Sequence, residues 1–195
     1  ANVALSVLMT MCSTLAAIVL TPLLTKFYAS AILDVDAWAM FRSMVTIVLL
    51  PVIGGIVLNR ILGHKLDGVR KISPIVSILV IVLIVGGVVG ATKSNIIAYF
   101  GVLLVAIFIL HVLGFLLGYG VGCMTRLAEG DRRTLSIEVG MQNSGLGSAL
   151  AKQHFTLLAA TPCAISALYH CLIGSFLAAI WRAASPEKET ETDQS

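Results

Sequence analysis

Residues 134–155, TLSIEVGMQNSGLGSALAKQHF, decide the fold of this chain. Both ends of the stretch have the apolar pattern of a membrane helix, but residues 138–147 (EVGMQNSGLG) hold three glycines and four side chains with hydrogen-bonding oxygens. Glycine, Asn and Ser all weaken a helix, and three glycines within eight residues weaken it strongly. The stretch therefore predicts a membrane helix that is broken at its middle.

Glu138 makes this break a candidate site, because it is the one charged residue well inside an apolar segment. An ionisable group at that depth costs a few kcal/mol and needs a partner, a water-filled cavity or protonation. Irregular backbone at membrane depth persists only where it is buried in protein or lines a cavity. Its freed carbonyls can bind a cation, and ligation by oxygen alone suits a hard ion such as Na⁺. A Glu paired with an Arg, or buried in its protonated form, is the structural alternative.

The composition places the break in a membrane protein. Apolar residues make up 58% of the 195 residues and charged residues 12%, whereas soluble domains carry roughly 25% charge. At some 20 apolar residues for each crossing, the chain has room for about six. A soluble enzyme, a nucleic-acid binder and a secreted disulfide scaffold are excluded. The net charge of +3 is explained by basic residues that fix topology, so no nucleic-acid partner is expected.

Charge-free windows predict an all-α protein with six transmembrane helices. Asp36 is expected to cap the second of them. A chain that starts at Ala1 directly on a membrane helix is expected to have further sequence upstream. The predicted spans are residues 3–25, 43–58, 73–92, 94–125, 134–155 and 162–181.

Basic residues in alternate loops predict the orientation. Four lie in the loop at 59–72, three in the loop at 126–133, and Arg182 begins the C-terminal tail. By the positive-inside rule these segments are cytoplasmic, which places both termini inside. The tail at 185–195 is polar and acidic, so we predict that it is disordered.

Several polar residues within the spans allow two interpretations each. Ser6 and Thr10 share one helix face, where their hydroxyls bond either to backbone carbonyls four residues earlier or to Glu138 as oxygen ligands. His111 and His170 are either neutral, hydrogen-bonded groups within the bundle or part of a polar cavity.

Small residues in the spans are expected to serve packing. Gly114, Gly118 and Gly122 form a strip at four-residue spacing that lets a neighbouring backbone approach closely, as static packing or as a sliding surface. The four cysteines show no CxxC spacing and are interpreted as small buried thiols.

The broken stretch also carries a family resemblance. TLSIEVGMQNSGL at 134–146, with the AKQHF run that ends at Phe155, resembles the ninth transmembrane segment of the bile acid:sodium symporter family. NVALSVLMT at 2–10 resembles the start of that family's fifth segment, and the similarity extends through Tyr169-His170 and Gly174-Ser175 in the last span.

The resemblance implies a ten-helix transporter built from two inverted five-helix repeats, with a core and a panel domain. This chain then holds segments five to ten: a first core helix and outer loop at 1–36, two panel helices at 37–93, and three core helices at 94–184. The family's other broken helix, with its Gly-Thr-Ala-Ser-Asn motif, is expected before Ala1 and supplies part of both ion sites.

The resemblance also implies two Na⁺ sites and a substrate cavity. One ion is bound by Ser6, Thr10 and Glu138, and the other by the side chains of Glu138 and Gln142 with the carbonyls of Val139 and Met141. The expected substrate residues are Asn143, Ser144 and His170, and Cys171 stands where some members carry an Asn that faces the substrate.

The expected function is sodium-coupled symport of an organic anion, either bile-acid-like or a small carboxylate, by alternating access across a lipid bilayer. A bacterial inner membrane is the expected location. The alternative is a proton-coupled anion transporter of the same fold, with Glu138 as the proton carrier. An intramembrane enzyme is disfavoured because there is no paired catalytic Asp, Ser/His motif or HExxH. A helical partner protein that does not transport is also disfavoured, because that role does not require a broken helix at 138–147. The substrate and the oligomeric state stay open.

Overall fold

The computed structural model describes residues 2–184, and within them every regular element is a helix. Five helical segments are long and apolar enough to cross a membrane. The remaining predicted span, the fifth along the chain at 134–155, is a pair of shorter helices, α7 (Glu129–Gly140) and α8 (Ser144–His154). The all-helical prediction is confirmed for this part of the chain. The five long segments are Val3–Ala29, Ala37–Leu62, Lys71–Ala91, Gly101–Met124 and Leu158–Ala184.

The second span is assembled from three consecutive helices. Asp36 accepts a hydrogen bond from the Ala39 amide at 2.9 Å and caps α2 (Ala37–Met44), as predicted. A π-helical turn, η1 (Val45–Leu49), leads into α3 (Leu50–Leu62). The helix therefore continues four residues beyond the predicted end at position 58, and it stops at Gly63, where φ is +46°.

We predict that Asp36→Ala lowers the free energy of unfolding by about 1 kcal/mol, because the substitution leaves a helix N-terminal amide without its acceptor. Asp34→Ala in the same loop is the matched control, since Asp36 is the residue that caps α2. Thermal unfolding of both purified variants measures the difference. Equal midpoints would show that the cap contributes nothing.

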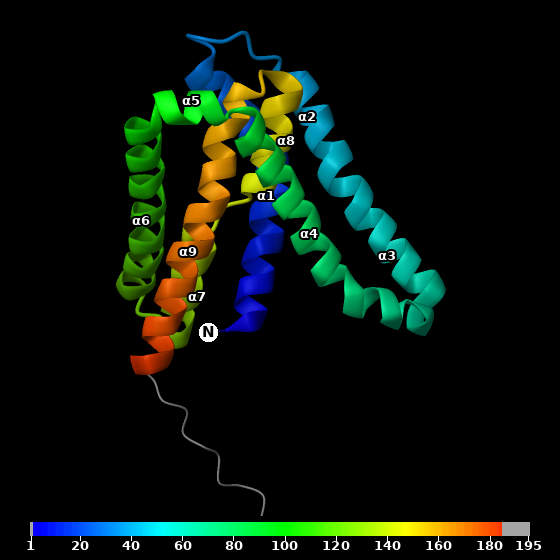
Figure 1. Cartoon of the computed structure of the whole chain (residues 1–195). Helices are drawn as coiled ribbons and strands as arrows, with labels where there is room; N and C mark the ends of the chain where they lie inside the picture. The colour runs from blue at the N-terminus through cyan, green and yellow to red at the C-terminus, as the bar shows by residue number, and fades with distance from the viewer. Residues whose placement is uncertain (1, 185–195) are drawn as a thin grey trace, which may run out of the picture.

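The predicted span at 94–125 is divided in two. α5 (Lys93–Ala98) and α6 (Phe100–Met124) are separated at Tyr99, whose φ and ψ of −109° and 17° are not helical. α5 lies nearly across the direction of α6 in Figure 1. The long charge-free window thus holds a bend, and only α6 has the length of a crossing.

The arrangement of the ends agrees with the predicted alternation of loops. Figure 1 shows the start of α1 (Val3–Ala29), the connection from α3 to α4 (Asp67–Ala91), the α6–α7 turn and the end of α9 (Thr161–Ala184) at one end of the molecule. The last three of these segments carry the basic residues on which the predicted orientation rests, whereas the start of α1 has none. That this end faces the cytoplasm stays a prediction, and the predicted disordered tail lies outside the described residues.

Glycines bring α6 and α7 into backbone contact, as the strip on α6 predicted. A Cβ atom at Gly118 would lie 2.6 Å from the Leu135 carbonyl oxygen, and one at Gly114 would lie 3.1 Å from the Val139 carbonyl oxygen. The Ser136 hydroxyl adds a hydrogen bond of 2.7 Å to the carbonyl of Phe115. The antiparallel α6–α7 pair is therefore held at a separation that permits no side chain on this face of α6.

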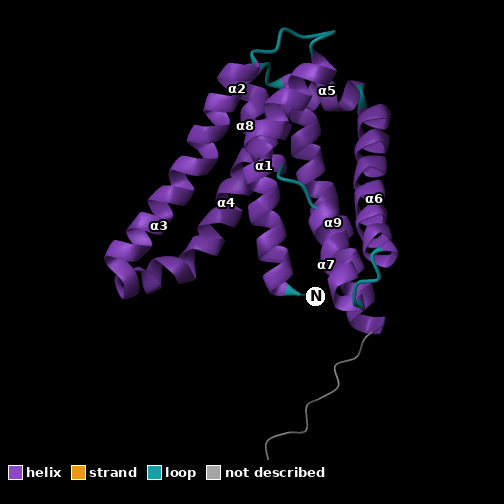
Figure 2. Cartoon of the chain, turned by 180° about the vertical axis from the view of Figure 1, so that it is seen from behind, coloured by secondary structure: helices purple, strands orange, loops and turns teal. Residues whose placement is uncertain are grey.

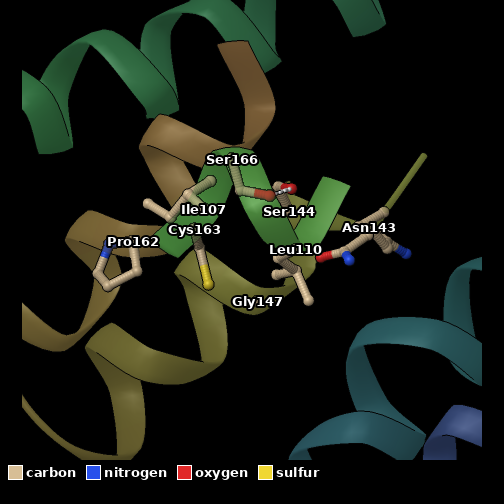
Figure 3. Close-up of a pocket in the computed structure, with 9 residues that line it drawn as sticks. Ile107, Leu110, Asn143, Ser144, Gly147, Pro162, Cys163 and Ser166 are labelled. Atoms are coloured by element: carbon tan, nitrogen blue, oxygen red, sulfur yellow. Dashed lines mark hydrogen bonds between the residues drawn. The ribbon is translucent and has the colours of Figure 1, made fainter. Parts of the chain in front are cut away.

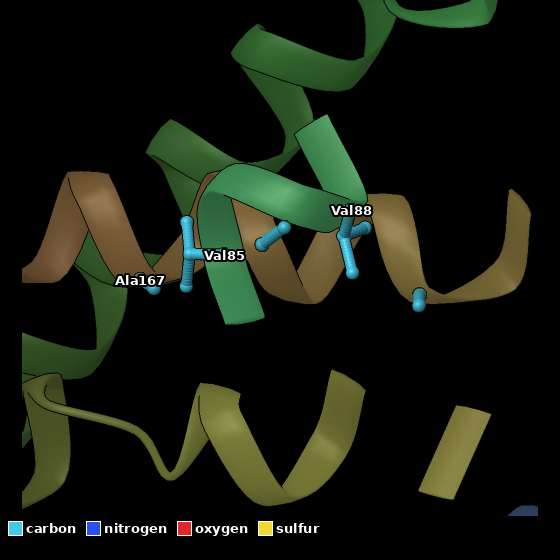
Figure 4. Packing of buried hydrophobic residues seen from close by; sticks show 5 residues of the cluster. Val85, Val88 and Ala167 are labelled. Carbon is cyan, nitrogen blue, oxygen red and sulfur yellow. The ribbon is translucent and has the colours of Figure 1, made fainter. Parts of the chain in front are cut away.

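Two small apolar clusters hold α8 in place. One joins α4, α9 and the short helix η3 (Leu158–Ala160), with α8 and its Ala151 beside it (Figure 4). The other joins α1, α2 and η1 to Leu150 of α8. The buried members of the first cluster are Val85, Val88, Ala160, Ala164 and Ala167, and those of the second are Ile18, Met44, Val48 and Leu150.

The outer faces of the long helices are apolar, which suits contact with lipid. Val3, Leu83 and Val102 are 75%, 73% and 78% exposed. The same geometry corrects the prediction for the cysteines. Cys163 is half-buried, but the other three thiols are exposed, because a residue inside a membrane span need not face the protein interior.

Candidate ion and substrate site

The helix break is present where the sequence predicts it. α7 ends at Gly140 and α8 begins at Ser144, and the loop between them is visible in Figure 2. The Met141 amide closes α7 with a bond of 2.8 Å to the Ile137 carbonyl. Asn143 caps α8 with a weak bond, because its side-chain oxygen accepts from the Leu146 amide at 3.4 Å.

The break frees backbone carbonyls. Within residues 2–184, no hydrogen bond reaches the carbonyl oxygens of Val139 or Met141. The Gly140 carbonyl accepts a bond of 2.9 Å from the ring of His111 on α6. Carbonyls freed from a helix at membrane depth need another partner, and a cation in a cavity is one way to satisfy them.

Two hydroxyls from α1 converge on the carboxylate of Glu138. The Ser6 hydroxyl donates to Oε1, and the Thr10 hydroxyl lies 2.7 Å from Oε2. The Thr10 hydroxyl also lies 3.0 Å from the Ser6 carbonyl, so both interpretations of this residue apply. Among the described residues, no Arg or Lys forms an ion pair with Glu138. Its carboxyl group is thus met by hydroxyl groups from another helix.

The register of α1 against α7 explains this convergence. At the start of α1, the Asn2 amide donates to the Thr134 hydroxyl at 2.8 Å, and the Asn2 side chain donates to Asp131 at 3.0 Å. The two helices run in the same direction (Figure 1). Because both helices advance by about one turn in four residues, the contact one turn beyond Asn2–Thr134 joins Ser6 to Glu138.

Two cavities flank the break. The first, of about 250 Å³, lies between α6, the break and α9, and Figure 3 shows Asn143 and Ser144 at its wall with Cys163 and Ser166. The second, of about 420 Å³, is bounded by η1, α4, the first turn of α8 and His170 of α9. Gln142, Asn143 and Ser144 line both cavities.

The predicted site residues fall into two groups. Ser6, Thr10 and Glu138 are in direct contact. The three predicted substrate residues line the second cavity. Gln142 lies at the cavities, and no hydrogen bond within 2–184 joins it to Glu138. The Val139 carbonyl oxygen lies against Gly114, and the Met141 side chain lies against Gly174.

Sequence reasoning missed Ser166. It is 5% exposed and joins the rings and hydroxyls behind the break, with its Oγ 2.7 Å from Nε2 of His111 and 3.0 Å from Oγ of Ser144. Its spacing of four from His170 on one helix face was the available signal. His111 is fully buried and hydrogen-bonded, as the simpler of its two interpretations predicted.

A second acid on α7 has a different setting. Glu129 accepts from Nε of Arg133 at 2.7 Å and from the Tyr119 hydroxyl at 3.0 Å. These hydrogen bonds, that from Arg133 first, hold the pKa of Glu129 below its ordinary value. Glu129 is thus an exposed group at the start of α7 that pairs with an Arg, whereas Glu138 lies near the end of α7 and contacts hydroxyl groups.

The comparison with known families agrees with this geometry. Residues 1–99, half of the chain, match the model of the Sodium Bile acid symporter family. The chain belongs to this family. The match covers α1, with two of the residues that meet at Glu138, and continues to α5.

Relatives of this symporter-family chain are named as sodium-dependent transporters. It is 41% identical over 188 residues to the "Probable sodium/metabolite cotransporter BASS1, chloroplastic" of Arabidopsis thaliana, covering 96% of this chain and 47% of the relative. It is 38% identical over 195 residues to the "Uncharacterized sodium-dependent transporter YocS" of Bacillus subtilis, covering 100% of this chain and 60% of the relative. The chain thus spans about half the length of these relatives. Their names agree with transport rather than catalysis.

Proposed function

We propose that the protein carries out sodium-coupled symport of an organic anion, a bile-acid-like molecule or a small carboxylate, by alternating access. The observation that carries this proposal is the convergence of the Ser6 and Thr10 hydroxyls on the Glu138 carboxylate beside a helix break. Family membership supports sodium as the coupling ion, and the names of two relatives include a sodium/metabolite cotransporter and a sodium-dependent transporter.

The first proposed Na⁺ site consists of these three side chains. All of their ligand atoms are oxygens, which suits a hard cation. The Ser6 hydroxyl donates to the carboxylate, and the Thr10 hydroxyl has both the carboxylate and the Ser6 carbonyl as acceptors. Ser6 and Thr10 would hold Na⁺ through their hydroxyl oxygens and Glu138 through its carboxylate, whose charge the ion would neutralise.

The second proposed Na⁺ site uses the break itself. Glu138 and Gln142 would supply side-chain oxygens, and Val139 and Met141 would supply their carbonyls. The lack of hydrogen bonds to these two carbonyls within 2–184 supports this assignment. The Val139 carbonyl lies against Gly114, and within 2–184 no hydrogen bond joins Gln142 to Glu138, so binding of the second ion would require the break to rearrange.

The anion is proposed to bind in the 420 Å³ cavity, next to Asn143, Ser144 and His170. The first turn of α8 lines this cavity, and the N-terminus of a helix carries partial positive charge that attracts anions. Ordering of the break by sodium then raises the affinity for the anion. We assign residues 1–36 and 94–184 to a core that moves against a panel at 37–93, in a bacterial inner membrane with the C-terminus in the cytoplasm.

Replacement of the ion tests the coupling. In vesicles that contain the intact protein, uptake of a panel of labelled carboxylates should disappear when Na⁺ is replaced by K⁺ at fixed pH, because Na⁺ is the proposed coupling ion. Collapse of the proton gradient at constant Na⁺ should leave the initial rate unchanged. Uptake that survives without Na⁺ and requires the proton gradient would instead identify Glu138 as a proton carrier and contradict the proposal.

A further inference from the structure

A line of hydrogen bonds runs behind the break and connects its two sides. It starts at the Gly140 carbonyl, passes through His111, Ser166 and Ser144, and ends at His170. The successive separations are 2.9, 2.7, 3.0 and 3.4 Å. We call these five groups the relay. All four of its side chains are buried, from 0% exposed at His111 to 8% at His170.

The first bond fixes where His111 carries its hydrogen. A carbonyl oxygen only accepts, so Nδ1 of His111 is the donor to Gly140. Among the described residues no carboxylate contacts His111, and the ring of His170 lies 5.5 Å away. A charged imidazolium in that setting would be buried without a counter-ion, which is costly. His111 is therefore neutral, and its Nε2 is an acceptor.

The remaining bonds then have only one consistent direction. The Ser166 hydroxyl donates its single hydrogen to Nε2 of His111, so its oxygen accepts from Ser144. The Ser144 hydrogen is used in turn, so the Ser144 oxygen accepts from Nδ1 of His170. If His170 instead carried its hydrogen on Nε2, both Nδ1 of His170 and the Ser166 oxygen would need the single hydrogen of Ser144. One of these two contacts would then bring two lone pairs together.

We propose that His111 and Ser166 are positioning residues that fix His170 with Nδ1 protonated and Nε2 unprotonated. No hydrogen bond within residues 2–184 reaches Nε2 of His170, and His170 lines the 420 Å³ cavity. An unprotonated Nε2 accepts a hydrogen bond. The part of the transported anion that contacts this nitrogen is then a donor, such as a hydroxyl or an N–H, and not the carboxylate. The part of this inference that concerns the anion rests on the proposed function, whereas the tautomers rest on the contacts alone.

The relay also couples the conformation of the break to the hydrogen bonding of His170 in the cavity. Gly140 is the last residue of α7, and Ser144 is the first residue of α8. A shift of the Gly140 carbonyl away from His111 removes the acceptor that fixes the direction of all the following bonds. Rearrangement of the break, which is where the second ion is proposed to bind, therefore changes the hydrogen-bonding character of His170.

Nuclear magnetic resonance of the intact protein with ¹⁵N-labelled histidine tests the relay. Long-range ¹⁵N–¹H correlations distinguish a protonated ring nitrogen from an unprotonated one, and His111→Asn and His170→Asn assign the signals. Above the pH range in which histidine titrates, both rings should show Nδ1 protonated and Nε2 unprotonated. Either ring with its hydrogen on Nε2 would overturn the proposal.

A pair of serine variants separates the relay from general packing. Ser166→Ala removes the link between His111 and Ser144 and should give His170 signals from both tautomers. Ser136→Ala removes an equally buried hydroxyl that also joins two helices, through the Phe115 carbonyl, and should leave His170 unchanged. An unchanged His170 spectrum in Ser166→Ala would contradict the inference. The spectra do not depend on uptake, so the loss of sodium dependence would remove the proposed function and leave the relay intact.

Discussion

Glu138→Ala is expected to abolish sodium-dependent uptake in the intact protein while the protein stays folded. The substitution removes the one carboxylate of the proposed ion sites. It leaves the Ser6 hydroxyl without its acceptor and the Thr10 hydroxyl with the Ser6 carbonyl alone. Even loss of a group that only supports a metal ligand costs about 10–100-fold in affinity or activity, so loss of the shared ligand should cost at least about 100-fold. Initial rates of uptake into vesicles measure the effect, and gel filtration confirms folding.

Glu129→Gln is the matched control on the same helix. Glu129 is an exposed carboxylate paired with Arg133, and it is separated from the break by more than two helical turns. Its loss should leave the sodium dependence within about twofold, since surface ion pairs contribute little. Normal sodium-dependent uptake by Glu138→Ala, or an equal loss in both variants, would refute the assignment of the ion site.

Gly118→Ala is expected to lower the stability of the protein strongly. The added Cβ atom would lie 2.6 Å from the Leu135 carbonyl oxygen and 2.9 Å from the Cα atom of Ser136, both of which are backbone atoms that cannot rotate away. Overpacking of this kind costs about 1–3 kcal/mol and here must push α6 and α7 apart. Thermal unfolding in detergent, followed by circular dichroism, measures the shift.

Gly120→Ala provides the comparison two residues along the same helix. A Cβ atom at Gly120 would meet nothing within 4 Å. Alanine also favours a helix over glycine by up to about 1 kcal/mol, so this variant should be as stable as the parent or slightly more stable. If both variants unfold at the same temperature, the contact between α6 and α7 is looser than described.

The sequence predicted the position of the break because its cause is local. Three glycines and the short polar side chains around Asn143 weaken the helix by themselves, and Asn143 then caps the second half. The cap at Asp36 and the glycine strip on α6 were predictable for the same reason. Each depends on residue types at a fixed spacing within one helix.

The features that the sequence did not predict depend on contacts between distant helices. The Ser6 and Thr10 hydroxyls had two plausible acceptors, and only the packing of α1 against α7 places Glu138 within reach. The sequence signal for Ser166 is only its spacing of four from His170, and its role comes from His111 on another helix. The apolar window of 32 residues at 94–125 is long enough to predict a tilt or a kink, but it carries no charge that would place the bend at Tyr99.

The glycine contact between α6 and α7 has a mechanical consequence. Where backbone meets backbone at Gly114 and Gly118, no layer of side chains can change rotamer to absorb a displacement. The two helices therefore move together as one rigid unit, like a stiff lever, and Glu138 on α7 moves with them. Sliding of α6 against α7 is excluded. Any change of shape has to be taken up at the ends of the lever, by the bend at Tyr99 and by the three-residue break that begins at Met141.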